Sequence, residues 1–438
     1  MISQPLRGCA LKTPALFLSL FILCGGDPAV TEIPSTRQLI EQLSAPDFKV
    51  REVAAKSLET AGEAVLPALR QAQPHADPEV RKRLTQLIAR LEKSFLLTPR
   101  LVTIKADQVP VGQVFADLAR QTGYQLNCVP GNSDVVTINV DNAPFWEAMD
   151  QVCRQTGLGL QSYGNDQDGL TFHRVGQYSP YVCYSGQFRV AAAGFHLSRS
   201  LDLAVRQQFN PLNPPRSETL TMTFQVVGEP KASLMSLGQP RLTLAEDAFG
   251  NSLVPPQGRV YESNYHDYSF SPRNAVRQTQ VQLHGPGAAQ SLRLVKGTVP
   301  ITFLAEKRPE LTIDDVMNVK DKKFEGSQIT LELHEVKESP GRQVTVYTTV
   351  RRNVGEGQFD YSWTNSLAQR IELLDDQGQK FVCEGFNWDS GNPTSVTGTF
   401  QFSDGGNKKL GRAKKLIYYN WIMGHHEVDF EFKDLPLP

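Results

Sequence analysis

Four residues close to the C-terminus have side chains that can bind metal ions: His425, His426, Glu427 and Asp429. A metal site needs at least three ligands that converge on one point. Neighbouring side chains on a strand point to opposite faces, so His425 and Glu427 would share a face that His426 does not. Two ligands on one face make an incomplete site. We therefore expect an exposed strand here, with no metal and no cofactor.

Two acidic turns raise the question of a calcium site. They are "EDAFGN" at 246–251 and "DDQGQ" at 375–379. Calcium takes about six to eight oxygen ligands, usually from a longer loop. Asp, Asn and Gly are also the preferred residues of hairpin turns, for reasons of backbone conformation alone. We interpret both segments as turns.

Aromatic side chains gather beside Asn, Asp and His in "VYESNYHDYSF" at 260–270, and in "FDYSW" at 359–363 with "FNWDS" at 386–390. Exposed rings on a sheet stack on sugars or anchor a protein partner. The alternative is that the same rings fill a core. The candidate ligand-binding residues are Tyr261, Tyr265, Tyr268, Trp363 and Trp388.

Cysteines offer one candidate disulfide, between Cys128 and Cys153. The alternative for Cys153 is a small buried residue on a helix. Motifs of common enzyme classes are missing: the chain has no G-x-S-x-G, no H-E-x-x-H, no C-x-x-C and no P-loop. We therefore expect no catalytic residues and no enzyme activity. The formal net charge of −1 provides no basic field for nucleic acid.

The first 26 residues have the features of a signal peptide. Arg7 and Lys12 precede the apolar run "ALFLSLFIL" at 15–23, which is too short to span a bilayer, and "CGG" at 24–26 offers a cleavage site after Gly26. This pattern predicts an exported protein of the periplasm or cell envelope, with no transmembrane segment in the mature chain. The alternative is a lipoprotein anchored through Cys24.

Residues 35–95 are predicted to be helical. The phrase "D-x-x-V-R" occurs at 47–51 and again at 77–81, and the apolar stripe of the first of these helices would be Val50, Val53, Ala54 and Leu58. A 30-residue period of paired helices resembles HEAT-type repeats. The alternative is a plain pair of helical hairpins. Either arrangement implies a surface for protein contact.

A longer repeat follows. "VTIKADQVPVGQVFADLARQTGYQL" at 102–126 recurs as "VTINVDNAPFWEAMDQVCRQTGLGL" at 136–160. Each copy begins with an alternating strand, passes through a proline into a helix, and ends at "RQTG", where Gly123 and Gly157 would be left-handed caps. Asp107 and Asp141 would lie in the turns before those prolines. The repeat predicts two strand–helix–strand units within 100–175.

These residues resemble the short N-terminal domain shared by secretins and TonB-dependent receptors. The resemblance covers 101–175 and rests on the "VTI" strands, the aspartate before each proline and the Thr-Gly helix ends. It implies two small βα units that dock to protein partners in the bacterial envelope. It does not extend to the parts of those proteins that form a pore.

From 176 onward the pattern changes to alternating strands separated by Gly, Pro and Asn turns. The segment "RLTLAEDAFGNSL" at 241–253 is echoed by "RIELLDDQGQKF" at 370–381. These patterns predict two similar immunoglobulin-like β-sandwiches, at 176–310 and 311–438.

The fold class expected is thus a multidomain chain: a HEAT-like helical segment at 35–95, a duplicated βα domain at 100–175, and two β-sandwiches. The expected function is that of an exported, non-enzymatic envelope protein that binds or scaffolds other proteins. The alternative is a carbohydrate- or cell-wall-binding protein that uses aromatic residues of the sandwiches.

Overall fold

The computed structural model describes residues 35–73, 77–128, 134–161, 169–174, 179–201, 216–255, 276–353, 362–406 and 410–438. The chain divides into two compact units between Ile88 and Ala89. The expected signal peptide, with Cys24, lies outside the described residues, and so do Tyr261, Tyr265 and Tyr268.

The described part of the first unit is helical, and polar side chains cap the starts of α1, α2 and α4 but not that of α3. Its elements are α1 (Thr36–Gln42), α2 (Phe48–Ala61), the 3-10 turn η1 (Gly62–Val65), α3 (Leu66–Ala72) and α4 (Pro78–Leu97), which continues into the second unit. Asp47 and Asp77 each accept a hydrogen bond of 2.8 Å from the backbone N–H two residues on. Gly62 ends α2 with a φ of 67°, as expected for a glycine stop.

The fold class expected from the sequence is wrong. Among the described residues 54% are strand and 25% helical, and no HEAT-like segment is shown. α1 and α3 have 7 residues each, whereas α2 has 14 and α4 has 20, so no helix pair of constant length recurs. Val50 and Val53 are exposed, although a stacked repeat would cover them. The recurring aspartates are explained by their N-cap hydrogen bonds, which any helix can use.

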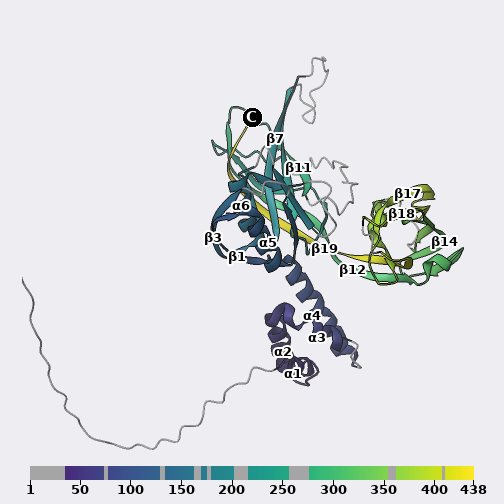
Figure 1. The fold of residues 1–438 in the computed structure, drawn as a ribbon. Coiled ribbons are helices and arrows are strands. Elements are labelled where there is room, and N and C mark those ends of the chain that lie inside the picture. Colours follow the sequence, from purple (N-terminus) through teal and green to yellow (C-terminus); the bar gives the residue numbers. More distant parts are fainter. Residues whose placement is uncertain are drawn as a thin grey trace, which may run out of the picture. The chain divides into compact units, whose positions relative to one another are not determined.

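Residues 101–174 form two strand–helix–strand segments that pair with each other (Figure 1). Their elements are β1 (Leu101–Pro110), α5 (Val111–Thr122), β2 (Gln125–Cys128), β3 (Val135–Pro144), α6 (Phe145–Thr156), β4 (Leu158–Leu160) and β5 (Gly169–Arg174). β1 and β3 are antiparallel, and β2, β5 and β4 form a second small sheet. Both predicted left-handed caps are confirmed, with φ of 74° at Gly123 and 68° at Gly157.

The rest of the chain consists mainly of strands. They are β6 (Val182–Ser185), β7 (Phe188–Leu201), β8 (Arg216–Gly228), β9 (Leu234–Leu237), β10 (Arg241–Asp247), β11 (Val276–His284), β12 (Ser291–Ile313), β13 (Lys322–Glu325), β14 (Ile329–Ser339), β15 (Gln343–Arg352), β16 (Ile371–Asp375), β17 (Val382–Asn392), β18 (Ser395–Ser403) and β19 (Ala413–Pro436). Short helical turns are η2 (Val316–Asn318), η3 (Ser362–Ser366) and α7 (Leu367–Arg370).

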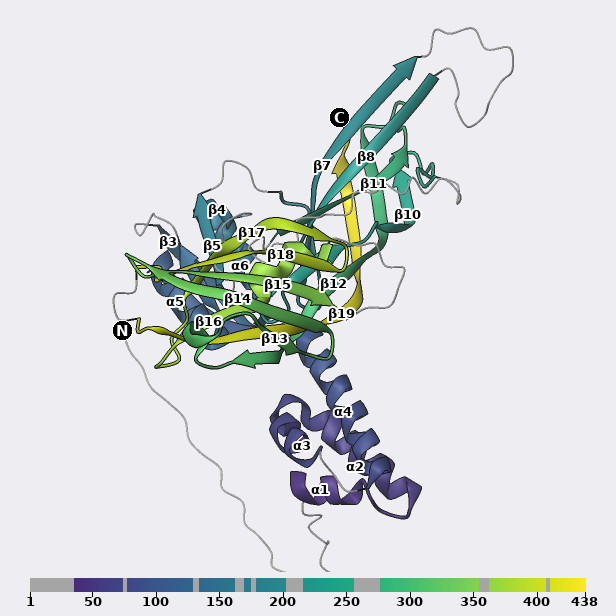
Figure 2. The ribbon, with the colours of Figure 1, turned by 90° about the vertical axis from the view of Figure 1, so that its right-hand side faces the viewer.

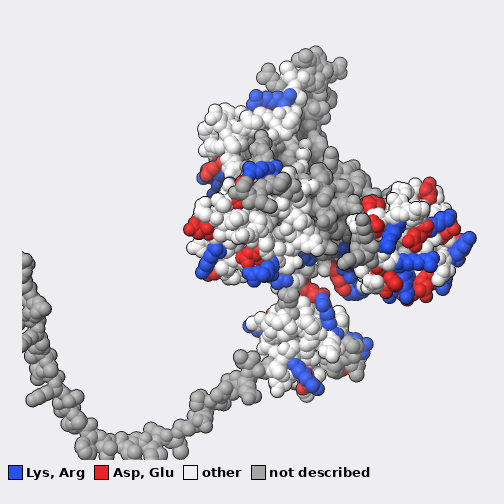
Figure 3. Space-filling view, viewed as in Figure 1, with Lys and Arg blue, Asp and Glu red and all other residues white. Residues whose placement is uncertain are grey.

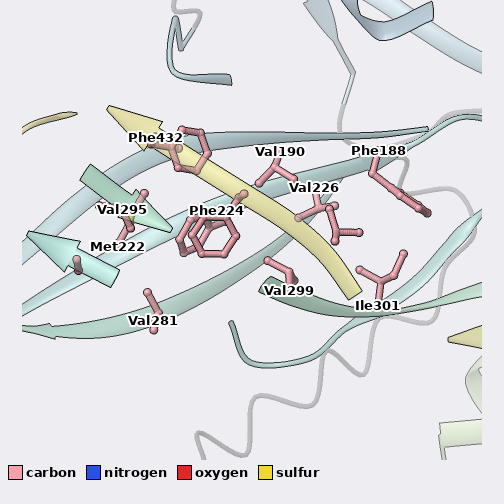
Figure 4. Close-up of a cluster of buried hydrophobic side chains, with 14 of the residues drawn as sticks. Phe188, Val190, Met222, Phe224, Val226, Val281, Val295, Val299, Ile301 and Phe432 are labelled. Carbon is pink, nitrogen blue, oxygen red and sulfur yellow. The ribbon is translucent and has the colours of Figure 1, made fainter. Parts of the chain in front are cut away.

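Two cores hold these strands together. One lies between the sheet β11-β8-β7-β6 and the β10-β12-β19 part of a second sheet, where Phe224 packs 4.7 Å from Phe430 between ring centres (Figure 4). The other lies beneath the sheet β13-β14-β15-β18-β17, visible in Figure 2, and includes residues of β16 and of one end of β12 and β19. Burial of these apolar side chains is the main stabilising term.

β12 and β19 belong to both cores. They pair antiparallel over their whole length, from Ser291 opposite Pro436 to Ile313 opposite Leu416. The boundary expected near 310 therefore falls inside a strand. β10 pairs with one end of β12 and β16 with the other end of β19, so the two echoed segments occupy opposite edges of one sheet. The last strand of the chain thus completes the core that β7 and β8 begin.

Candidate functional site

The repeated "RQTG" joins each helix to its own strand. The amide of Gln121 accepts from the backbone N–H of Thr103 at 3.0 Å and donates to its carbonyl at 2.8 Å. Gln155 makes the same pair of bonds to Thr137, at 3.0 and 2.9 Å. The repeated glutamine therefore joins the helix of each unit to its strand in the same way.

The two units are also linked across β1 and β3. Thr103 donates to Asp141 at 3.1 Å, and Thr137 donates to Asp107 at 3.4 Å. Both aspartates lie within strands, not in turns before the prolines, so the turn prediction is wrong. The chain bends one residue later, where Gln108 and Asn142 have φ of 53° and 51°. β1 and β3 are thus related by an approximate two-fold arrangement that the exchanged Thr–Asp bonds stabilise.

The outer face of α6 is attached to the protein's own β-sheet. Asp150 is 3% exposed, and its two carboxylate oxygens share the single Nε–H of Arg189 on β7, at 3.0 and 2.8 Å. The hydroxyl of Tyr184 on β6 donates to the same carboxylate at 2.7 Å. Val227 and Val276 pack against the core of the duplicated units. A buried pair with extra hydrogen bonds defines one orientation, so α6 is fixed on this sheet.

The equivalent face of α5 is open. Positions 34 residues before Trp146, Asp150 and Cys153, which are all buried, are occupied by Gly112, Ala116 and Ala119. Ala116 is exposed, and its neighbours Gln113 and Arg120 on the same side are exposed too. The repeat forms the same buried stripe twice, from Val111, Val114, Phe115 and Leu118 in α5 and from Phe145, Ala148, Met149 and Val152 in α6. The outer face of one helix is in contact with the sheet, whereas that of the other faces solvent.

A second buried junction ties the start of β1 to the end of β8. Glu229 is fully buried and accepts from the backbone N–H of Arg100 at 3.1 Å and from the hydroxyl of Tyr124 at 2.6 Å. Burial raises the pKa of Glu229, and the Tyr124 hydrogen bond and the nearby Lys231 partly oppose that shift. Each oxygen has a partner, so this group holds the fold together and does not present a reactive acid.

The structure places the predicted aromatic residues in different settings. Trp363 is 8% exposed, and its indole N–H donates to the carbonyl of Pro393 at 2.9 Å. Trp388 lies on the edge strand β17 and is 42% exposed. The two are therefore not parts of one binding surface. The three predicted tyrosines lie outside the described residues.

The four cysteines among the described residues have free thiols. Cys153 is buried and Cys128 half-buried, and no bond joins them. Burial raises the pKa of the Cys153 thiol to about 12, and it also raises the pKa of Cys128. A thiol with a raised pKa is rarely present as the reactive thiolate.

The C-terminal histidines and the acidic turns are engaged with the protein itself. His425 Nδ1 lies 3.1 Å from Thr302 Oγ1, and Glu427 pairs with Arg241 at 2.8 Å. No group of three or more potential ligands that could bind a metal occurs within the described ranges. Asp247 and Asp375 accept backbone N–H groups of their own turns, so their oxygens already have donors. That arrangement agrees with the interpretation as turns.

A polar pocket lies where β12 and β19 meet β14, β15 and α7, and the sequence analysis did not predict it. Its volume is about 210 Å³, and its walls include Glu310, Arg352, Trp363, Arg370 and Trp421. Of these residues, only Trp363 is among the ligand-binding candidates that the sequence indicates. The others come from separate elements whose spacing in the sequence contains no signal of their meeting.

Positive and negative side chains are mixed on the face shown in Figure 3. There, Lys and Arg alternate with Asp and Glu over the region of β14, β17 and β18. No helix among the described residues is both long and apolar enough to cross a membrane. Comparison of the chain with family models, curated proteins and solved structures found no significant match.

Proposed function

We propose that this protein is an exported, non-enzymatic protein of the bacterial envelope that binds another protein through the outer face of α5. The observation that carries the proposal is the difference between the two copies of the repeat. The outer face of α6 is bound to the chain's own sheet through Asp150, whereas the same face of α5 is exposed around Ala116.

The physical argument rests on the equivalence of the two helices. Both have the same buried stripe, the same pair of glutamine hydrogen bonds to a strand and the same left-handed cap. Small residues at Gly112, Ala116 and Ala119 allow another backbone to approach α5 closely. The resemblance of 101–175 to the secretin and TonB short N-terminal domain supports a docking role of this kind.

A single substitution on α5 tests the proposal. The full chain, carrying an affinity tag, is used to capture proteins from an envelope extract, and Ala116→Arg is compared with the wild type. Ala89→Arg on α4 is the matched control, because it places the same side chain at an exposed alanine within a helix. We expect Ala116→Arg to lose the captured partner and Ala89→Arg to retain it. Unchanged capture by Ala116→Arg would contradict the proposal.

Trp388 favours the second candidate function, glycan binding. Its ring is 42% exposed on an edge strand, a position from which aromatic rings can stack on sugars. Loss of glycan-array binding in Trp388→Ala, with the unfolding curve unchanged, would support this candidate. Unchanged glycan binding by that variant would exclude Trp388 as the binding residue.

The N-terminus of the mature protein tests the proposed location. Mass spectrometry would distinguish a chain cleaved after Gly26 from a chain lipidated on Cys24. An intact N-terminus starting at Met1 would contradict export by this signal.

A further inference from the structure

The pocket where β12 and β19 meet β14, β15 and α7 contains two guanidinium groups whose positions are fixed. Arg370 Cζ lies 4.4 Å from the ring centre of Trp421, and Arg352 Cζ lies 5.8 Å from that of Trp363. Arg370 Nε also donates to Ser366 Oγ at 2.9 Å. Stacking on an indole face is favourable for a cation and holds its planar group in one orientation. The pocket is therefore pre-organised.

A carboxylate opposes these cations, and only one of its oxygens is engaged. Glu310 Oε1 accepts from the backbone N–H of Ile329 and from Ser327 Oγ, both at 3.2 Å. Glu310 Oε2 is buried and has no hydrogen-bond partner among the described residues. The carboxylate is thus anchored from one side and leaves one acceptor for another group.

Two donors in the same pocket also have no hydrogen-bond partner within the described part of the chain. They are Arg352 Nη1 and Trp421 Nε1, both buried. Trp421 is only 6% exposed, so its N–H cannot reach bulk solvent freely. Leaving buried donors and acceptors unpaired is unfavourable, and such groups are normally satisfied by a partner. Two open donors and one open acceptor in one small pocket define what the missing partner must offer.

We propose that this pocket binds a small carboxylate that also carries an N–H or O–H donor. The carboxylate accepts from Arg352 Nη1 and Trp421 Nε1, and the donor binds Glu310 Oε2. Two guanidinium groups against one carboxylate give the walls a net positive charge, which favours an anionic group. A volume of about 210 Å³ admits a compact ligand and is below the size typical of drug-like pockets.

Two kinds of molecule share this chemistry. An amino acid or a peptide C-terminus provides a carboxylate with an ammonium or amide N–H. An acidic sugar provides a carboxylate with hydroxyl groups. Calorimetric titration of the full chain with L-alanine, L-alanyl-L-alanine, glucuronate and acetate distinguishes them, because acetate has the carboxylate but no second donor.

We expect at least one of the three bifunctional probes to bind more tightly than acetate. Binding of alanine or its dipeptide identifies the amino-acid source, and binding of glucuronate identifies the sugar source. Trp421→Phe retains a ring beneath Arg370 but removes the N–H, so it should weaken binding roughly tenfold. Glu310→Gln should weaken binding of an ammonium-bearing probe by a similar factor.

Trp146→Phe is the matched control, because Trp146 lies on α6 and does not line the pocket, and its indole N–H is likewise buried with no hydrogen-bond partner among the described residues. Circular dichroism checks that each variant is folded, and if Trp421→Phe does not fold, Glu310→Gln carries the test. Absence of binding by all three bifunctional probes at millimolar concentration would overturn the proposal. Equal binding of acetate, or an equal loss in Trp146→Phe, would also overturn it.

Discussion

Asp150→Ala is the substitution that most directly tests how the duplicated units are attached to the β-sheet. The side chains of Asp150 and Arg189 are 4% and 11% exposed, and their closest atoms lie 2.8 Å apart. Removing the carboxylate takes this counter-charge away from the buried Arg189 cation, and it takes this acceptor away from the Tyr184 hydroxyl. Removal of one partner from a buried pair typically costs about 3–5 kcal/mol of unfolding free energy.

Urea denaturation of the full chain measures this loss. Asp117→Ala is the matched control, since Asp117 pairs with Arg120 on the exposed side of α5 and such surface pairs contribute roughly 0–1 kcal/mol. A local readout is the rate at which Cys153 reacts with a thiol reagent, followed by peptide mass spectrometry. Cys153 is buried on the same side of α6, so undocking of α6 should increase its labelling rate.

A double variant separates the ion pair from simple packing. Arg189→Met added to Asp150→Ala removes the buried cation that has lost the Asp150 carboxylate, so it should restore part of the lost stability. The reasoning would be refuted if Asp150→Ala lost no more stability than Asp117→Ala and if its Cys153 were labelled at the wild-type rate.

Three further predictions follow from the structure. Gln121→Ala and Gln155→Ala each remove two hydrogen bonds to a strand backbone, and each should cost about 1–2 kcal/mol by urea denaturation, with nearly equal losses. Phe432→Ala should cost about 3–5 kcal/mol and increase hydrogen exchange in β7 and β8 rather than in β14 and β15, because Phe432 belongs to the first core. Burial alone would raise the pKa of Asp375, but backbone N–H donors, led by Gly411, lower it below the ordinary 3.8. The ionised carboxylate therefore stabilises the folded state fully above pH 3.8, and this contribution is lost as the pH falls below that value. Asp375→Asn should lower the unfolding midpoint at pH 6. The difference from the wild type should shrink as the pH is lowered.

Local features of the fold were predictable from the sequence. Gly123 and Gly157 end their helices as expected, because a left-handed cap depends on the few residues around it. The apolar stripe of each repeat is buried for a similarly local reason, the helical period of 3.6 residues. The HEAT-like expectation failed because a capped helix start, such as Asp47 or Asp77, does not by itself define what the helix packs against.

The candidate surfaces depended on contacts between distant residues. The repeat could not indicate that α6 would be covered and α5 left open. The partner of Asp150 is Arg189, which lies outside the repeat, on β7 of the sheet β11-β8-β7-β6. The pocket likewise forms from Glu310, Arg352 and Trp421, which lie far apart in the sequence and follow no recognisable spacing. One residue, Trp363, was found from the sequence, because clustered aromatic residues are a local signal.

The sequence by itself determined that each helix of the repeat follows a proline and ends at a glycine, and that one unit would be formed twice. Only the tertiary structure decided that β19 would pair with β12 along its whole length and so complete the core begun by β7 and β8. The physical reason is that helix periods and caps are set within a few residues, whereas strand pairing and the choice of buried face are set by packing between segments far apart in the chain.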